Sequence, residues 1–161
     1  MKVSSIDWDN WTPEEVATLL FVARADEVLL IRKKRGLGAG KINGPGGRLE
    51  ENETPLECAI RETQEELLIN PLDIRPAGEL FFHANDMPRI HAHIFVAGNY
   101  EGKPTETDEA IPIWFRYEDI PFDEMWDDDR LWLPRVLAGE SVQGFFTFVE
   151  ETMLDHDIRF F

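Results

Sequence analysis

Three glutamates near the middle of the chain have a spacing suited to metal chemistry. Glu62, Glu65 and Glu66 stand at i, i+3 and i+4, so a helix would bring them to one face, with Arg61 at its margin. Carboxylates this close repel by up to about 4 kcal/mol per pair at a surface dielectric, unless a cation collects them. Oxygen ligands suit Mg²⁺, or alternatively Mn²⁺, and such ions commonly bridge to substrate phosphates. The alternative is a solvated acidic helix.

The segment that carries these glutamates has strong helix signals. Thr54 and Glu57 form a T-x-x-E capping box, and Pro55 occupies the first helical position, where its missing N–H costs nothing. We expect Asn70 to take a left-handed position at the end of the helix, with Pro71 as a stop. A period of 3.6 residues then predicts a buried stripe. The stripe consists of Leu56, Ile60, Thr63 and Leu67.

Small residues surround the start of this helix. Gly46 and Gly47 precede it and provide a backbone that can approach a ligand closely. Cys58 and Ala59, on the carboxylate face one turn before the glutamates, are small enough to let a loop lie against them. Arg61 can position a glutamate or neutralise a phosphate. These features favour a metal and phosphate site over a solvated helix.

The whole segment resembles the Nudix box of the Nudix hydrolases, which cleave diphosphate bonds. The matching positions are Gly47, Glu53, Arg61, Glu62, Glu65 and Glu66. Two positions depart from the motif, since Leu68 replaces its usual glycine and Thr63 replaces an aliphatic residue. The first departure concerns only the end of the helix, which Asn70 and Pro71 are expected to provide.

The composition predicts one soluble globular domain. Of the 161 residues 43% are hydrophobic and 30% are charged, and no apolar run is long enough to span a membrane. A single cysteine, Cys58, and the lack of a signal peptide favour the cytoplasm, and we expect a monomer there. The net charge of −16 argues against a nucleic-acid polymer as partner, but a small phosphorylated substrate bound through cations remains compatible.

The order of the apolar runs predicts an α+β fold with a mixed β-sheet between helices. A hairpin is expected over 16–23 and 28–32, paired strands over 73–83 and 90–98, a polar loop over 99–107, and a short strand over 113–116. A second helix over 126–137 and strands over 143–149 and 153–158 complete the chain. The resemblance implies the same arrangement, the α/β/α Nudix sandwich. Residues 1–14 are expected to be an N-terminal extension, and 15–161 a single Nudix hydrolase domain.

Two further patterns are weaker. Lys33, Lys34 and Arg35 lead into a glycine-rich stretch that suits an anion such as a triphosphate, although a flexible surface loop is the alternative. His83, His91 and His93 could suggest a zinc site, and His91 and His93 alternate on an expected strand, but no cysteine or acidic fourth ligand joins them at metal spacing. We therefore do not expect zinc there and interpret the three histidines as pocket-wall or structural residues.

The resemblance extends to the oxidised purine nucleoside triphosphate hydrolases of the MutT-homologue type and covers about 16–157. It lies in the stretch 33–53, in Asp108-Glu109 before a strand, and in Met125 to Pro134. It implies hydrolysis of 8-oxo-dGTP and 2-hydroxy-dATP to the monophosphate and pyrophosphate, which cleanses the nucleotide pool. The implied substrate-binding residues are Thr18, Lys33, Asn43, Trp126, Asp128 and Asp129.

The chemistry of these implied residues is reasonable. Trp126 offers a face on which a purine can stack. Adjacent Asp128 and Asp129 can read the base edge if one carboxyl stays protonated and the other ionised, which burial and mutual repulsion favour. The alternative is that 127–129 form an acidic run capping a helix. Leu37 replaces a phenylalanine of the family, so one aromatic contact to the base is lost.

The resemblance also implies the reaction centre, in which the metal activates a water for attack on phosphate. The implied metal ligands are the carbonyl of Gly46 with Glu62, Glu65, Glu66 and Glu109. Arg61 is expected to orient a glutamate, and Glu65, Glu66 or Glu109 to accept the water's proton. Two other functions stay open. One is a Nudix hydrolase for another nucleotide, such as ADP-ribose or an undamaged dNTP, and the other is a nucleotide-binding module without turnover.

Overall fold

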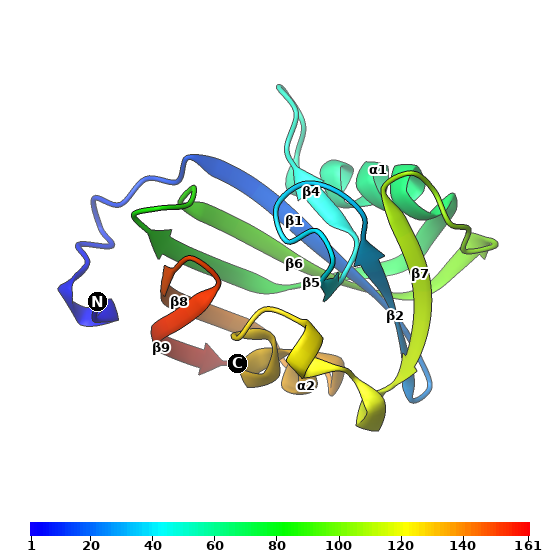
Figure 1. Ribbon diagram of the computed structural model, residues 1–161. Coiled ribbons are helices and arrows are strands. Elements are labelled where there is room, and N and C mark those ends of the chain that lie inside the picture. The colour runs from blue at the N-terminus through cyan, green and yellow to red at the C-terminus, as the bar shows by residue number, and fades with distance from the viewer.

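Two helices cover opposite faces of a curved, mixed β-sheet in the computed structural model, which describes residues 1–161 (Figure 1). The helices are α1 (Pro55–Leu67) and α2 (Asp129–Leu137). The strands are β1 (Glu15–Arg24), β2 (Glu27–Lys33), β3 (Ile42–Asn43), β4 (Gly46–Arg48), β5 (Ile69–Ala84), β6 (Ile90–Gly102), β7 (Ala110–Arg116), β8 (Val142–Val149) and β9 (Thr152–Phe160). Neither helix has the length and apolar character needed to cross a membrane.

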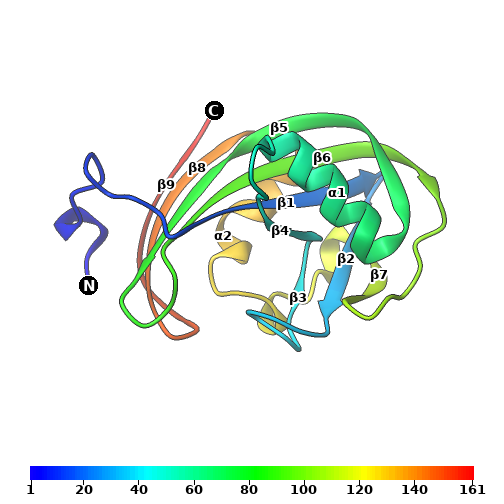
Figure 2. The same ribbon diagram turned by 90° about the horizontal axis from the view of Figure 1, so that it is seen from above.

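The strand order is β3-β2-β1-β6-β5-β8-β9, with β4 paired to β1 and β7 paired to β2. The pairs β1–β6 and β5–β8 are parallel and the others are antiparallel, which confirms the mixed sheet. The long strands curve around α2 (Figure 2), and α1 lies on the other side of the sheet (Figure 1). The predicted α+β sandwich is therefore confirmed.

Alternating residues of the central strand β1 supply two separate cores. Leu20 and Val22 pack in a cluster that includes Leu67 of α1, whereas Phe21 packs in a larger cluster with Trp132 of α2. Successive side chains of a strand point to opposite faces, so β1 separates the two layers. The active-site elements described below gather around this strand.

The start of α1 is as predicted, but its end is not. The Thr54 side chain accepts from the Glu57 backbone N–H and the Glu57 carboxylate accepts from that of Thr54, so the capping box is complete. The left-handed residue at the end is Leu68, at φ 59°, and not Asn70. Asn70 and Pro71 belong to β5, so the expected stop is wrong. The helix ends where the Nudix box normally places its glycine.

The buried side of α1 also differs from the expected stripe. Leu56 is 43% exposed and Ile60 only partly buried, whereas Cys58, Ala59 and Glu66 are buried together with Thr63 and Leu67. The helix is thus turned so that its small residues and one carboxylate face the protein. Hydrophobicity predicted the burial of Thr63 and Leu67 correctly but not the rest of the inner face, because Glu66 and the small residues Cys58 and Ala59 are buried there instead of Leu56.

The predicted strands are confirmed, with longer bounds. The hairpin forms as β1 and β2, and the paired strands as β5 and β6. The predicted loop over 99–107 is wrong in its first part, because β6 continues to Gly102. The second helix begins at Asp129, three residues later than expected, and leaves Trp126 and Asp128 in the turn before it. That turn carries part of the site.

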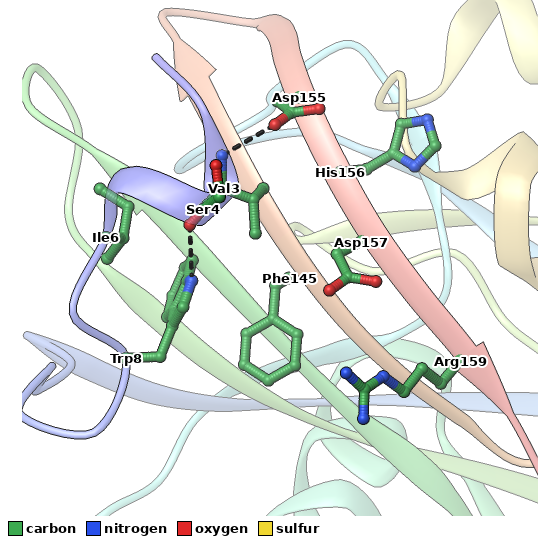
Figure 3. Close-up of a pocket in the computed structure, with 9 residues that line it drawn as sticks. All are labelled: Val3, Ser4, Ile6, Trp8, Phe145, Asp155, His156, Asp157 and Arg159. Atoms are coloured by element: carbon green, nitrogen blue, oxygen red, sulfur yellow. Dashed lines mark hydrogen bonds between the residues drawn. The ribbon is translucent and has the colours of Figure 1, made fainter.

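Residues 1–14 lie against the β8–β9 end of the sheet (Figures 1 and 3). The Val3 N–H donates to Asp155 Oδ2 at 2.8 Å, and Trp8 Nε1 donates to the Val3 carbonyl at 3.0 Å. The Trp8 ring packs edge-on against Phe145 of β8, with centroids 4.9 Å apart. The division into an extension and a domain from residue 15 stays a prediction.

Candidate active site

Three carboxylates from two elements converge beside β4. Glu62 and Glu66 project from α1, and Glu109 precedes β7. One oxygen of each lies within 4.8 Å of the others, a separation that a single cation can span. Arg35 Nη2 donates to Glu109 Oε1 at 3.0 Å, so the basic glycine-rich loop reaches the same place.

Two glycines bring the backbone of β4 against these acids. The Gly46 N–H donates to Glu66 Oε1 at 3.1 Å, and a Cβ on Gly46 would lie only 1.8 Å from the Thr18 carbonyl oxygen. A Cβ on Gly47 would lie 2.5 Å from the Glu62 carboxyl carbon. Only glycine at position 46 therefore allows β4 to pair with β1, and a side chain at position 47 would displace the Glu62 carboxylate.

Burial dominates the electrostatics of the cluster. Glu66 is 3% exposed, and desolvation raises its pKa to about 8, assisted by the charges of Glu62 and Glu109 and opposed by the Gly46 N–H. Desolvation likewise raises the pKa of Glu62, and Arg61 opposes this. Buried acids that cannot all ionise unaided fit a divalent cation, which supplies the missing positive charge. The donor set is all oxygen, which suits a hard ion.

Arg61 contacts the acids around the cluster. Its Nε donates to Glu53 Oε2 at 2.7 Å, and its Nη1 donates to Glu62 Oε1 at 2.7 Å and to Glu65 Oε2 at 3.2 Å. The bond from Arg61, assisted by the Glu50 backbone N–H, lowers the pKa of Glu53 to about 2. Glu65 has a half-exposed side chain and lies outside the three-carboxylate cluster. Arg61 therefore makes the bonds that an orienting role requires, and the metal role of Glu65 stays a prediction.

A cavity of about 540 Å³ joins the carboxylates to the predicted substrate residues. Its lining includes Gly46, Glu62, Glu66 and Glu109 together with Thr18, Lys33, Asn43, Trp126, Asp128 and Asp129. Arg61 and Glu65 are not part of this lining. Sequence reasoning missed the apolar wall from β5, β6, β8 and the loop between β5 and β6, which includes Phe82, Phe148 and, in that loop, Met87. No pattern in the sequence marks these residues, apart from the strand periodicity around Phe82 and Phe148.

The two adjacent aspartates are buried in this cavity. Trp132 Nε1 donates to Asp128 Oδ2 at 2.8 Å, and Asp129 Oδ2 is the only buried side-chain nitrogen or oxygen without a hydrogen-bond partner. Desolvation raises the pKa of Asp128 to about 6 and raises that of Asp129 well above its ordinary value, with the Asp128 charge adding to the second shift. Asp128 stands at the N-cap of α2 but makes no capping bond, so the capping alternative is not supported.

Trp126 forms a wall beside the aspartates. Its ring lies so close to the backbone at Gly38 that a Cβ there would be 3.0 Å from the indole nitrogen. Lys41 Nζ lies 5.2 Å from the ring centroid, a cation–π distance. The Thr18 hydroxyl, in contrast, pairs with the Cys58 thiol at 3.4 Å, and Cys58 does not line the cavity. The hydroxyl of Thr18 is thus engaged elsewhere.

The two histidines of β6 differ from expectation. The cavity lining takes Ile90 and Ala92 from β6, whereas His91 and His93 alternate with them and lie on the opposite face of the sheet. The pocket-wall interpretation is therefore wrong for His91 and His93, and the alternative, that they are structural residues, stays open. An acidic residue also joins them at metal spacing, because Glu79 of β5 has an oxygen within 4.8 Å of both rings' nitrogens.

Comparison with known proteins places this geometry in a family. The NUDIX domain model matches residues 13–136. The chain is 39% identical to an oxidized purine nucleoside triphosphate hydrolase of Danio rerio, covering 89% of this chain and 94% of that protein. It is 38% identical to the protein of that name from Mus musculus, covering 88% and 92%.

The fold agrees with solved structures. The MutT protein of Bacillus halodurans superposes with a TM-score of 0.79 at 24% identity, covering 89% of this chain and 97% of that one. The family match spans most of the chain and includes the carboxylate cluster, the two glycines of β4 and the adjacent aspartates. The chain therefore belongs to the Nudix hydrolase family.

Proposed function

We propose that this enzyme hydrolyses oxidised purine nucleoside triphosphates, such as 8-oxo-dGTP and 2-hydroxy-dATP, to the monophosphate and pyrophosphate. The observation that carries the proposal is the Asp128–Asp129 pair, buried in the same cavity as the acidic cluster and containing one oxygen without a partner. The names of the Danio rerio and Mus musculus relatives support the same substrate class.

The aspartate pair suits a base edge that presents both donors and acceptors. A protonated carboxyl donates a hydrogen bond and an ionised one accepts, and two buried neighbours of raised pKa favour that mixed state. If the proton moves from one carboxyl to the other, the pair matches the opposite pattern. This accounts for acceptance of both guanine-like and adenine-like oxidised bases, with Trp126 providing the stacking face.

The acidic cluster suits phosphoryl chemistry with Mg²⁺, or with Mn²⁺ in its place. Glu62, Glu66, Glu109 and the Gly46 carbonyl would hold the cation, with Glu65 as a further ligand. When bound, such an ion polarises phosphate oxygens and lowers the pKa of a bound water. The family generally uses divalent metals, and the all-oxygen donor set supports Mg²⁺ in particular.

The remaining roles are to position the acids, to contact the nucleotide and to accept the proton. Arg61 holds Glu53 and Glu62 in place, and Lys33 and Asn43 are proposed contacts to the nucleotide, as is Thr18. Glu65, Glu66 and Glu109 are the proposed proton acceptors.

We propose a cytoplasmic monomer that acts on free nucleotides. The single cysteine and the net charge of −16 support this setting, since the first needs no oxidising compartment and the second repels nucleic-acid polymers.

The test is steady-state hydrolysis of 8-oxo-dGTP and dGTP with Mg²⁺, with product analysis for pyrophosphate. We expect the wild type to prefer the oxidised base, Glu66→Gln to lose turnover of both substrates, and Asp129→Asn to lose mainly the preference. Asp127→Asn is the matched control, because this neighbouring carboxylate is exposed and bonds only the Met153 N–H. A preference for undamaged dGTP or for ADP-ribose would refute the proposed substrate, and nucleotide binding without turnover would refute catalysis.

A further inference from the structure

Three potential metal ligands meet on the face of the sheet opposite Ile90 and Ala92, the cavity-lining residues of β6. His91 and His93 stand two residues apart on β6, so their side chains share this face. Glu79 of β5 is directly paired with His93 in the strand register, and it shares the same face. The sheet pairing thus assembles a His₂Glu group that involves none of the reaction-centre residues.

The distances suit one ion. Glu79 Oε1 lies 2.9 Å from His91 Nε2 and 3.8 Å from His93 Nδ1, and the three ligand atoms all lie within 4.8 Å of one another. Tetrahedral Zn²⁺, with ligands at about 2.0–2.2 Å, places its ligand atoms about 3.4 Å apart. Small side-chain rotations therefore bring all three atoms onto one ion, with a fourth position left for water.

The group is both anchored and open to solvent. The His91 ring stacks on Phe81 with centroids 4.4 Å apart and planes 14° apart, and Phe81 stacks in turn on Phe145 of β8 at 4.9 Å. This stack fixes the His91 ring. The side chains of His91, His93 and Glu79 are 20%, 22% and 44% exposed, so an ion can reach them.

A simple hydrogen bond between Glu79 and His91 is the competing explanation. It accounts for the 2.9 Å contact but leaves His93 without a function, since that ring forms no hydrogen bond with another residue. His93 faces Glu79 across the register, and its ring centroid lies 4.4 Å from that of His91. A bound cation uses all three groups at once.

We propose that Glu79, His91 and His93 form a second metal site, which takes Zn²⁺ and is separate from the acidic reaction centre. The ligand types distinguish the two sites, because imidazole nitrogen suits Zn²⁺ whereas carboxylates alone suit Mg²⁺. Zinc at this position links β5 to β6. Along the sheet the pairing continues from His93 to Thr18 of β1 and then to Gly47 of β4, beside the reaction centre.

The test is titration of chelator-treated full-length protein with Zn²⁺ in excess Mg²⁺, followed by calorimetry and by NMR of the histidine rings. We expect one equivalent to bind and to shift the resonances of His91 and His93 but not those of exposed His156. His93→Gln should weaken Zn²⁺ binding about 100-fold or more, because loss of an outer-shell partner alone costs up to that much. His156→Gln is the matched control and should bind as the wild type does.

The result is decisive in either direction. Binding that survives in His93→Gln, or that is lost in Glu62→Gln, would place the zinc elsewhere and overturn the proposal. The wild-type NMR titration does not depend on the folding of any variant, and unchanged His91 and His93 resonances at saturating Zn²⁺ would overturn it equally.

Discussion

Gly47 offers the sharpest test of the reaction-centre geometry. A methyl group at this position would lie 2.5 Å from the Glu62 carboxyl carbon and 2.6 Å from its Oε1. Non-bonded carbon atoms need about 3.5 Å, so Gly47→Ala must displace the Glu62 carboxylate by about 1 Å. A misplacement of this size at a reacting centre costs about 100-fold in rate, which corresponds to about 2.7 kcal/mol of transition-state stabilisation.

The same substitution should leave the fold intact. Gly47 does not have a left-handed φ, so alanine fits its backbone conformation, and the atom that must move is the end of a flexible side chain. Reduced freedom of the unfolded chain adds about 0.4–1 kcal/mol of stability. We therefore expect the free energy of unfolding to stay within about 1 kcal/mol of the wild type, while turnover falls and the Mg²⁺ requirement rises.

The assay is steady-state nucleotide hydrolysis over a range of Mg²⁺, together with denaturant unfolding. Gly98→Ala is the matched control, because its added methyl group would meet only Asp73 at an ordinary 3.7 Å. It should retain wild-type turnover. Wild-type kinetics in Gly47→Ala would refute the assignment of Glu62 to the centre, and a large loss of stability would refute the flexible-side-chain argument.

Three further predictions concern the end of α1, Arg61 and Glu66. Leu68→Gly should raise the free energy of unfolding by up to about 1 kcal/mol in denaturant titrations, because Leu68 is exposed and holds a left-handed φ of 59°. Turnover should not change, and an unchanged free energy of unfolding would contradict the prediction. Arg61→Lys should lower kcat about 10–100-fold with little change in KM, since lysine cannot bond Glu53 and Glu62 in the same fork geometry. An increase in KM alone would show that Arg61 binds substrate. The folded state raises the pKa of Glu66 from 4.5 to about 8, so it retains a proton that the unfolded chain releases. Stability in EDTA should therefore fall as pH rises from about 5 to 8. Glu66→Gln should flatten that slope between pH 6 and pH 8, and an unchanged slope would contradict the assignment to Glu66.

Local signals predicted much of the fold correctly. The capping box at Thr54 is a pattern of neighbouring residues, and the alternation in β1 and β2 reflects burial on two faces, so both are visible in one dimension. The rotation of α1 about its own axis, which decides which residues are buried, is not visible in such local patterns. The inner face is decided by contacts from outside the helix, such as the Gly46 N–H that bonds Glu66, while the Thr63 hydroxyl can be buried because it bonds the Ala59 carbonyl within the helix at 2.7 Å. Such contacts stabilise the helix more than burial of Leu56 would, and Leu56 stays exposed.

The site residues likewise fall into those that local sequence patterns reveal and those that only the folded structure brings together. The glutamates of α1 have a helical spacing that can be read directly, whereas Glu79 and His93 meet only through strand register between distant segments. Asp128 and Asp129 were found by resemblance, because an acidic run before a helix looks like a cap. Their burial, and the tryptophan that bonds Asp128, depend on the packing of α2 against the concave face of the sheet.

The packing around Cys58 has a consequence for resistance to damage. The thiol is fully buried, burial raises its pKa to about 11, and it lies 3.5 Å from the Gly47 carbonyl oxygen. Oxidants attack the thiolate, and this environment leaves almost none at neutral pH. The proposed substrates accumulate under oxidative stress, when exposed thiols elsewhere are modified. The one sulfhydryl of this chain is held in the protonated, inaccessible form, so we expect oxidants to leave this thiol, and with it the packing beside the carboxylate centre, unchanged.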